Sequence, residues 1–534
     1  MPEEGRGVQL NPAAVKRMIG DGEEVALLDV REEGLFATGH LLFACSLPLS
    51  HLELRAATLV PRRETRTIVI DEDGGPLAQL AARRLSDFGW KNIAVLQGGV
   101  EGWRRAGFEI FSGINVPSKA FGELVEDQCG TPRITPAELK RRLEQGEDII
   151  ILDSRPQEEF RVMSIPGALD CPGAELVYRA FDLARGRTAT VVVNCAGRTR
   201  SIIGAQSLIN AGMENPVFAL ENGTMGWRLA GLELAHGRDD VAPPPSADGL
   251  SRAQAAASSL AQRLGLREIG WNDLAQMQSQ SQRALYLLDV RTPAEYQSGH
   301  PAGWRCAPGG QLVQATDQYV GTLKSRLVLG DSDGVRARMT ASWLIQMGWR
   351  DVFVLRDNLS TRAWESGAER PEILPLLTEI ASLEAGELHQ MLASGAATVI
   401  DFATSLEYRA GHIEGAWWAI RARLEQALPR LPQAGALVAT SPDGVLARFA
   451  AADLAKLTAR PVFALRAGTA GWRAAGFSLI TQPEQLADEP VDVWYRPYQN
   501  RQGPEDAMRA YLAWELGLLE QIARDGDARF AVAK

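Results

Sequence analysis

The chain has 534 residues, of which 46% are hydrophobic and 23% charged, and its formal net charge is −10. This composition is close to the globular average, so it excludes wholesale disorder and collagen-like repeats, and the acidic balance argues against a nucleic-acid binder. The length predicts about three to four domains.

A short apolar run that ends in aspartate recurs four times along the chain. The aspartates are 124, 136 and 112 residues apart, at Asp29, Asp153, Asp289 and Asp401. A tryptophan closes each unit with nearly the same period, at Trp103, Trp227, Trp364 and Trp472. Because these periods are as long as whole domains, they indicate tandem domains rather than a solenoid.

The order of predicted elements is the same in each unit. After the first strand we expect a short helix, a second apolar strand, an amphipathic helix that ends near a glycine, and a third strand. Apolar strands that alternate with helices are typical of a parallel sheet covered on both faces. Three histidines recur at one equivalent spot, where a shared structural hydrogen bond is expected: His40, His300 and His412.

The stretches between the units predict the domain limits. We expect domains at 1–114, 133–237, 266–367 and 378–481, followed by a tail at 482–534. The linkers are 115–132, 238–250 and 366–375, and three consecutive prolines stiffen the second one. An apolar stripe at helical spacing over 504–524 predicts a tail helix docked on the body.

The most informative segment follows the second strand of unit two and reads Asn194-Cys195-Ala196-Gly197-Arg198-Thr199-Arg200-Ser201. It places a thiol between the end of a strand and the start of a helix, where open α/β sheets bind ligands. The backbone N–H groups of the loop and the helix dipole favour an anion there. Together with Arg198 and Arg200 they stabilise a thiolate, so Cys195 is the candidate nucleophile.

The other three units carry no thiol at this position. Aligned on the strand, the expected counterparts of Cys195 are Glu72, Asp331 and Ser441. A carboxylate at a helix N-terminus caps the free N–H groups itself and repels an anion, so these units are predicted to be inactive. No base for Ser441 is apparent.

We expect no reactive role for the remaining cysteines, no targeting signal and no metal site. Cys45, Cys129, Cys171 and Cys306 lie in apolar or linker segments and are expected to be inert. The start of the chain shows no secretory pattern, and no stretch approaches a membrane span. Few cysteines and no CxxC pair predict a cytoplasmic location. No metal-ligand spacing or phosphate-binding glycine loop is present, so no metal or cofactor is expected.

Taken together, these motifs resemble the rhodanese (thiosulfate sulfurtransferase) family. The resemblance rests on the Asp-Val-Arg motif, segment 407–416, the cysteine loop and segment 98–103. It implies four tandem rhodanese-like domains of the bacterial type, each a five-stranded parallel sheet with helices on both faces. It also implies that Cys195 accepts sulfane sulfur as a persulfide, that the N–H groups from Ala196 to Ser201 cradle it, and that Arg198 and Arg200 bind the donor. Asp153 and Arg155 match the family's Asp-x-Arg motif, which supports the loop.

The activity implied by the resemblance is transfer of sulfur from thiosulfate, through Cys195, to a thiophilic acceptor such as cyanide or a thiol. The loop from Cys195 to Arg200 has the length found in sulfurtransferases, not the longer one of their phosphatase relatives. Two alternatives stay open: a binding scaffold or anion sensor, because three domains lack the thiol, and a phosphatase or arsenate reductase-like enzyme. The expected partners are small sulfur compounds, without nucleic acid or membrane, and homo-oligomer formation stays open. Unit one is expected to pack as an inactive partner against unit two.

Overall fold

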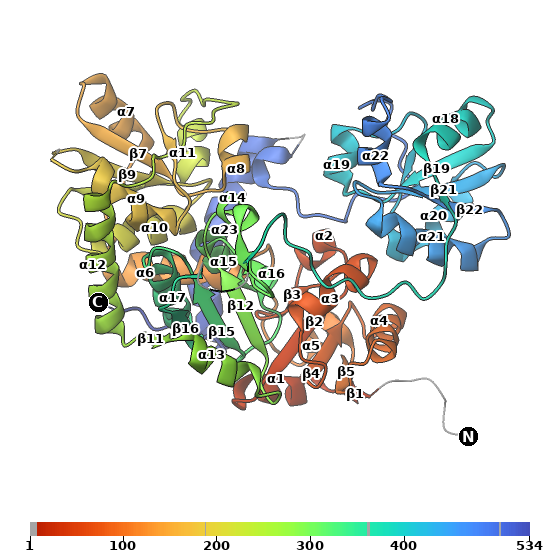
Figure 1. The fold of residues 1–534 in the computed structure, drawn as a ribbon, viewed down its shortest axis with the longest axis horizontal. Coiled ribbons are helices and arrows are strands. Elements are labelled where there is room, and N and C mark those ends of the chain that lie inside the picture. Colours follow the sequence, from red (N-terminus) through yellow and green to blue (C-terminus); the bar gives the residue numbers. More distant parts are fainter. Residues whose placement is uncertain (1–7, 187, 360–361, 363, 501–502, 534) are drawn as a thin grey trace.

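The computed structural model describes residues 8–186, 188–359, 362, 364–500 and 503–533 (Figure 1). Four α/β units follow one another, and each contains a five-stranded parallel sheet. In unit two the strand order is β6-β10-β9-β7-β8, and the other units repeat this order. The prediction of four doubly covered parallel sheets is therefore confirmed.

The bounds of the elements in the first two units follow the predicted order. Unit one contains β1 (Gln9–Leu10), α1 (Pro12–Gly20), β2 (Val25–Asp29), α2 (Glu33–Phe36), β3 (Cys45–Ser46), α3 (Leu52–Leu59), β4 (Arg66–Ile70), α4 (Pro76–Asp87), β5 (Ile93–Leu96) and α5 (Gly99–Arg105). After α6 (Val116–Cys129), unit two contains β6 (Arg133–Ile134), α7 (Pro136–Glu144), β7 (Ile149–Asp153), α8 (Gln157–Val162), β8 (Leu169–Asp170), α9 (Glu175–Leu183), β9 (Thr190–Asn194), α10 (Thr199–Asn210), β10 (Val217–Leu220) and α11 (Gly223–Leu229).

The second half of the chain repeats the pattern. After α12 (Ala247–Leu264), unit three contains β11 (Arg267–Ile269), α13 (Trp271–Gln278), β12 (Leu285–Asp289), α14 (Pro293–Ser298), β13 (His300–Pro301), β14 (Arg305–Cys306), α15 (Gly309–Gln314), α16 (Thr316–Tyr319), β15 (Arg326–Gly330), α17 (Arg336–Gln346), β16 (Val352–Leu355) and β17 (Trp364–Glu365). Unit four contains β18 (Ser382–Leu383), α18 (Ala385–Ala393), β19 (Ala397–Asp401), α19 (Ser405–Ala410), β20 (Trp417–Trp418), α20 (Leu424–Ala427), β21 (Ala436–Thr440), α21 (Val445–Leu457), β22 (Val462–Leu465) and α22 (Gly468–Ala474), and the tail forms α23 (Pro504–Asp525).

One of the four closing tryptophans departs from the predicted repeat. Trp103, Trp227 and Trp472 lie buried on α5, α11 and α22. Trp364 lies in β17, which pairs antiparallel with β13, and it is 45% exposed. Ala363, which the sequence pattern placed in the same motif, lies outside the described residues. The sequence period therefore identified Trp364 as the tryptophan that closes unit three, but this residue lies in an exposed strand and not in a buried helix.

Units two and three share one continuous hydrophobic core. It contains apolar residues of α9 and α10 together with those of α12, α15 and α17. At this interface the Trp343 indole N–H donates a 2.8 Å hydrogen bond to the Ser207 hydroxyl, and Arg336 forms a 2.8 Å ion pair with Glu175. The expectation that unit two packs against unit one is wrong, because unit three covers the apolar faces of α9 and α10.

Unit one instead contacts units three and four. The Tyr286 hydroxyl of unit three donates a hydrogen bond to the Leu59 carbonyl. On the other side, Arg421 of unit four forms a buried 2.6 Å ion pair with Glu53. Figure 1 shows unit four, in cyan and blue, beside unit one at the edge of the molecule.

The predicted linker at 115–132 is largely the helix α6, which packs against α10 and against the tail helix α23. The tail helix was predicted, and its buried face includes Met508, Leu512, Glu515 and Leu518.

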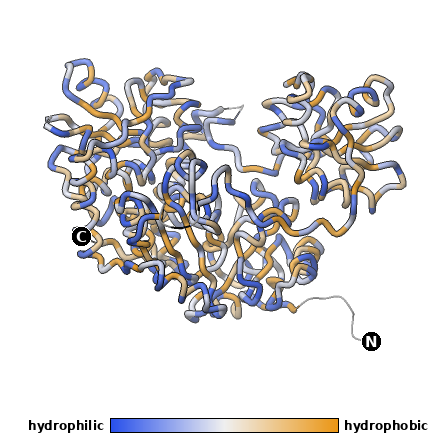
Figure 2. Tube along the Cα trace, in the orientation of Figure 1, coloured by the Kyte–Doolittle hydropathy of each residue, from blue (hydrophilic) through white to orange (hydrophobic). Residues whose placement is uncertain are grey.

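Apolar and polar stretches alternate along the trace (Figure 2). Among the described residues, no helix combines the length and apolar character needed to cross a bilayer.

Candidate active site

Cys195 follows β9 directly, and α10 begins four residues later, so the thiol lies at the N-terminus of a twelve-residue helix. Its side chain is buried, and the Ser201 hydroxyl donates a 3.1 Å hydrogen bond to its Sγ atom. Ser201 is buried as well. The structure thus brings the side chains of Cys195 and Ser201, both from the segment that the sequence singled out, into contact.

The N-terminus of α11 fixes the back of the loop. The Thr224 N–H donates to the Cys195 carbonyl at 2.8 Å, and the Met225 N–H donates to the Ala196 carbonyl at 3.0 Å. Gly223 allows this close approach: its φ is +57°, and a Cβ atom there would lie 2.2 Å from the Cys195 carbonyl oxygen. A side chain at this position would therefore force the loop to move.

The same backbone contact identifies the counterparts of Cys195 in the other units. In unit one the Val100 N–H donates to the Asp71 carbonyl, and in unit four the Thr469 N–H donates to the Ser441 carbonyl. The counterpart in unit one is therefore Asp71. The assignment of Glu72 from the sequence is wrong by one residue, because Asp29 pairs with Ile70 in the sheet as Asp153 pairs with Asn194.

In these units an oxygen of the protein occupies the place of the thiol. The Asp71 carboxylate accepts hydrogen bonds from the N–H groups of Gly74, Gly75 and Ala78. Asp331 accepts from the N–H groups of Gly334 and Ala337, and the Ser441 hydroxyl accepts from that of Ala447. A side-chain oxygen therefore satisfies N–H donors at the start of the helix in three units, and unit two has a thiol in that place.

Asp153 and Arg155 form a buried pair beneath the loop. Asp153 accepts from Nε of Arg155 at 2.8 Å and from Nη2 at 2.7 Å, and it also accepts from the Asn194 amide. Nη2 also donates to the Met163 carbonyl. The Nη1 atom of Arg155 is buried and has no hydrogen-bond partner among the described residues.

Arg198 points to α6 and is held in a structural ion pair. It donates to both oxygens of Glu123 at 2.7 Å and to Glu126 at 2.5 Å. Both Arg198 and Glu123 are buried. Its charge is therefore matched by two carboxylates, and the structure gives it a role in joining α10 to α6.

Arg200 lies within electrostatic reach of Cys195. It donates to Glu159 at 2.8 Å and to the side-chain oxygen of Gln311, from unit three, at 3.3 Å. Arg496 of the tail lies 3.2 Å from the same carboxylate. Burial disfavours ionisation of Glu159, but Arg200, Arg496 and Arg155 outweigh it and lower the pKa of Glu159 to about 2. Two guanidinium groups thus share one carboxylate, which leaves a surplus of positive charge near the loop.

Helices α6 and α23 cover the middle of the loop, and the sequence did not anticipate this. A Cβ atom on Gly197 would lie 3.3 Å from Tyr511 and 3.3 Å from Glu515. The Thr199 hydroxyl donates to Glu515 at 3.4 Å, and a Cβ atom on Gly122 would lie 2.8 Å from the Thr199 methyl group. The apolar stripe of the tail predicted docking, but no local pattern indicated where the tail would dock.

The other cysteines and the repeated histidines have structural surroundings. Burial raises the pKa of the Cys45 and Cys171 thiols well above their usual range and that of Cys306 to about 12. Each repeated histidine stacks on an aromatic ring one helical turn earlier, and its Nδ1 atom hydrogen-bonds a backbone carbonyl: His40, His300 and His412. Within the described ranges, no group of three or more His, Cys, Asp or Glu side chains is placed to hold a metal.

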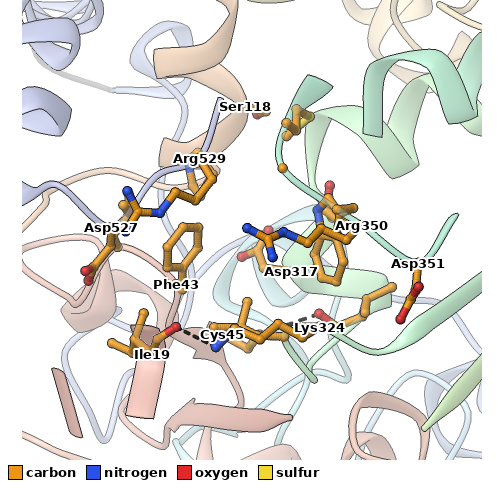
Figure 3. Close-up of a pocket in the computed structure, with 18 of the residues that line it drawn as sticks. Ile19, Phe43, Cys45, Ser118, Asp317, Lys324, Arg350, Asp351, Asp527 and Arg529 are labelled. Atoms are coloured by element: carbon orange, nitrogen blue, oxygen red, sulfur yellow. Dashed lines mark hydrogen bonds between the residues drawn. The ribbon is translucent and has the colours of Figure 1, made fainter. Parts of the chain in front are cut away.

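A separate cavity of about 260 Å³ lies between unit one, unit three and the C-terminal segment (Figure 3). Phe43, Cys45, Arg350 and Arg529 are among the residues that line it. The Cys195 loop does not line this cavity.

Fold and site together define a class: tandem α/β domains in which one strand-to-helix loop carries a buried thiol. Within this class the chain belongs to the rhodanese family of sulfurtransferases. The rhodanese-like domain family matches the chain four times, at residues 11–106, 135–230, 271–362 and 384–475.

A solved structure of a thiosulfate sulfurtransferase from Pseudomonas aeruginosa resembles the whole chain. It is 46% identical, the alignment covers 99% of this chain and 100% of that one, and the TM-score is 0.95. Two curated proteins match one stretch each: an HTH-type transcriptional regulator of Mycobacterium tuberculosis, 38% identical over 113 residues, and a tRNA uridine(34) hydroxylase of Xanthomonas axonopodis, 37% identical over 113 residues. The matches cover 21% and 19% of this chain, and the chain spans about half the length of these curated relatives, 49% and 44%.

Proposed function

We propose that the protein transfers sulfane sulfur from thiosulfate, through a persulfide on Cys195, to a thiophilic acceptor such as cyanide or a small thiol. The observation that carries the proposal is the comparison of the four loops. Three units fill the start of the helix with a carboxylate or hydroxyl oxygen, whereas unit two places a thiol there with Ser201 donating to its sulfur. Only unit two has a nucleophile suited to hold sulfur.

The first half-reaction is a displacement at sulfur. The Cys195 thiolate attacks the outer sulfur of thiosulfate, a new S–S bond forms, and the S–S bond within thiosulfate breaks. Sulfite leaves with the electron pair, and the negative charge of the thiolate passes to the terminal sulfur of the persulfide. The Ser201 hydroxyl and the N–H groups at the start of α10 then face an anion in both the starting and the loaded state.

Arg155 is the first candidate to contact the donor. In unit one the equivalent Arg31 uses its Nη1 atom to bind Glu72 at 2.5 Å. The residue at the Glu72 position of unit two is Ala196, which offers no carboxylate, and Nη1 of Arg155 has no partner in the described part of the chain. A buried N–H group that has no partner beside the loop can donate a hydrogen bond to a bound anion and so balance its charge.

Arg200 supports the same charge, while we assign Arg198 to structure. Arg200 and Arg496 share Glu159, so their combined charge exceeds that of the carboxylate. Arg198 is matched by Glu123 and Glu126 and has no surplus to offer a donor. In the second half-reaction the acceptor attacks the terminal sulfur, and the Cys195 thiolate leaves with the electron pair. No cofactor takes part in either step of this scheme.

The printed name of the four-domain relative from Pseudomonas aeruginosa, thiosulfate sulfurtransferase, supports the choice of donor. The six-residue loop from Cys195 to Arg200 supports sulfur over phosphate or arsenate as the group transferred.

We propose 1–114, 133–237, 266–367 and 378–481 as the domain limits. The five free cysteines suit a reducing compartment, so we keep the cytoplasm as the proposed location.

Mass spectrometry of the peptide that contains Cys195 tests the proposal. After treatment with thiosulfate this peptide should gain about 32 Da, the mass of one sulfur atom, and lose it again with cyanide. Cys195→Ser should abolish turnover, while alanine at Cys45, Cys129, Cys171 or Cys306 should preserve it. Turnover of p-nitrophenyl phosphate that disappears in Cys195→Ser would overturn the assignment in favour of a phosphatase.

A further inference from the structure

A buried lysine from outside the rhodanese-like domains lies beside the Cys195 loop. Lys119 is on α6, and it is 3% exposed. Its Nζ atom lies 4.6 Å from the ring centre of Tyr511, 4.7 Å from that of Trp514 and 5.3 Å from that of Trp494. Tyr511 also lies against Gly197. The ring of Tyr511 is therefore next to both Lys119 and the Cys195 loop.

The ammonium group has little to neutralise it. In the part of the chain that the structure describes, no carboxylate oxygen lies within 4 Å of Nζ. The three ring faces attract a cation but carry no net charge. The negative charge of Glu515 acts on Lys119 without direct contact and raises its pKa, against the larger effect of burial. The Oε1 atom of Glu515 accepts a 2.9 Å hydrogen bond from Tyr511, and its buried Oε2 atom has no hydrogen-bond partner in the described residues.

We propose that Lys119, held by the tail residues Trp494, Tyr511 and Trp514, binds the anionic end of the sulfur donor at the Cys195 site. The inference rests on the proposed function, and it assigns donor recognition to a linker helix and the tail. The catalytic site would then require the whole chain, although its nucleophile lies in one domain.

The charge distribution around the loop favours this role. Arg198 is matched by two carboxylates, whereas Arg200 shares Glu159 with Arg496, and Lys119 adds a further cation beside that surplus. The charges of Arg200 and Cys195 both act on Lys119, so its ammonium group lies within electrostatic reach of the Cys195 sulfur. A desolvated ammonium group surrounded by π faces attracts a dianion more strongly than an exposed one does. The pKa of Lys119 is lowered to about 8. Burial is the largest cause, and the positive charges of Arg200 and Arg496 contribute as well. Such a shift is expected for a cation that has no counter-ion bound.

The test compares anionic and neutral reagents that modify the same thiolate. Rates of Cys195 modification are followed by peptide mass spectrometry in the full-length protein, with thiosulfate as the anionic reagent and methyl methanethiosulfonate as the neutral one. The variants are Lys119→Gln, which removes the charge, and Lys119→Arg, which keeps it. Lys140→Gln is the control, because Lys140 lies on the exposed surface of α7 and forms an i,i+4 ion pair with Glu144.

Lys119→Gln should slow sulfur transfer from thiosulfate by at least about tenfold, which corresponds to ~1.4 kcal/mol, and leave modification by the neutral reagent within about twofold of the original. Lys119→Arg should retain a substantial part of the thiosulfate rate, and Lys140→Gln all of it. Equal slowing with both reagents would overturn the inference, because the lysine would then act on the thiolate or the fold. An unchanged thiosulfate rate in Lys119→Gln would also overturn the inference about Lys119. In that case the proposed function would still stand, provided that thiosulfate loads sulfur onto the unmutated protein. If the unmutated protein takes no sulfur from thiosulfate, the proposed function itself fails.

Discussion

The Ser201 hydroxyl donates a 3.1 Å hydrogen bond to the Sγ atom of Cys195, and both side chains are buried. A hydrogen bond to a buried anion is among the stronger ones, worth about 1.5–3 kcal/mol. In the proposed mechanism this hydrogen bond stabilises the thiolate before attack and the persulfide sulfur after it. The proposal therefore gives Ser201 a catalytic role in addition to its place in α10.

Ser201→Ala should slow sulfur loading of Cys195 by about tenfold or more, because one donor to the reacting sulfur is lost. The measurement is the rate at which thiosulfate adds sulfur to the Cys195 peptide in a single turnover. Ser279→Ala, at the exposed end of α13, is the control and should have no effect on this rate. An unchanged rate in Ser201→Ala would show that the hydrogen bond serves packing only.

Gly223 offers a test of the loop geometry, with Gly231 as a matched control. Both glycines have a positive φ, +57° and +74°, so alanine is strained at either place by about 1–2 kcal/mol. At Gly231 a Cβ atom meets nothing within 4 Å, whereas at Gly223 it would lie 2.2 Å from the Cys195 carbonyl oxygen. Gly231→Ala should therefore lower stability slightly and keep activity.

Gly223→Ala should lose activity by about 100-fold or more, since the Cys195 backbone must move and misplaced reacting groups are costly. Thermal unfolding and steady-state turnover of both variants separate the strain from the displacement. Equal activity in the two variants would mean that the contact with α11 does not position the thiol.

Arg198 and Arg200 should respond to substitution in different ways. Arg198→Met leaves Glu123 and Glu126 without their partner, and loss of one member of a buried ion pair costs about 3–5 kcal/mol of stability. Arg200→Ala should instead lower kcat/KM for thiosulfate by about tenfold or more. Unfolding curves and kinetics for both variants check this. A rise in KM for Arg198→Met without loss of stability would restore its predicted role in donor binding.

The sequence predicted what is local and repeated. The three longer strands of each unit, the cysteine loop and the tail helix follow from runs of neighbouring residues, and the Asp153–Arg155 pair follows from a short motif. The error at Glu72 arose because the end of an apolar strand can be shifted by one residue without changing its pattern. Only the pairing of Asp29 with Ile70 in the sheet identifies Asp71.

The sequence did not predict contacts between elements far apart in the chain. The whole of units two, three and four lies between Lys119 and Glu515 in the sequence, and no local pattern connects these two residues. Likewise the prediction that Arg198 binds the donor does not include its ion pairs with Glu123 and Glu126, because these lie on α6, within a stretch predicted to be a linker. The packing of unit two against unit three depends on which apolar helix faces meet, and both unit one and unit three offered such faces.

The shared core predicts that units one and two are insufficient by themselves. A chain ended near Pro243 lacks α12, α15 and α17, which cover α9 and α10, and it lacks Gln311, Arg496 and Glu515 beside the loop. Large exposed apolar faces favour aggregation. We expect this shortened chain to be poorly soluble or to load sulfur much more slowly than the full chain. Full sulfur loading of a soluble, shortened chain would contradict the need for the later units.

The pH dependence of sulfur loading should reveal Lys119. Its pKa is lowered to about 8, so the ammonium cation is present below this value and is lost as pH rises through it. The charged or titratable groups around it are Glu515, Tyr511, Arg496, Arg200 and Cys195. Arg200 stays cationic and Tyr511 neutral in this range, because the pKa of each is raised. The rate of modification by thiosulfate, divided by the rate with methyl methanethiosulfonate so that ionisation of the thiol cancels, should therefore fall between about pH 7.5 and 9. Lys119→Arg should remove this fall, since its charge persists, and Lys119→Gln should give a low rate without it. A fall near pH 8 that survives in Lys119→Gln would assign the titration to another group.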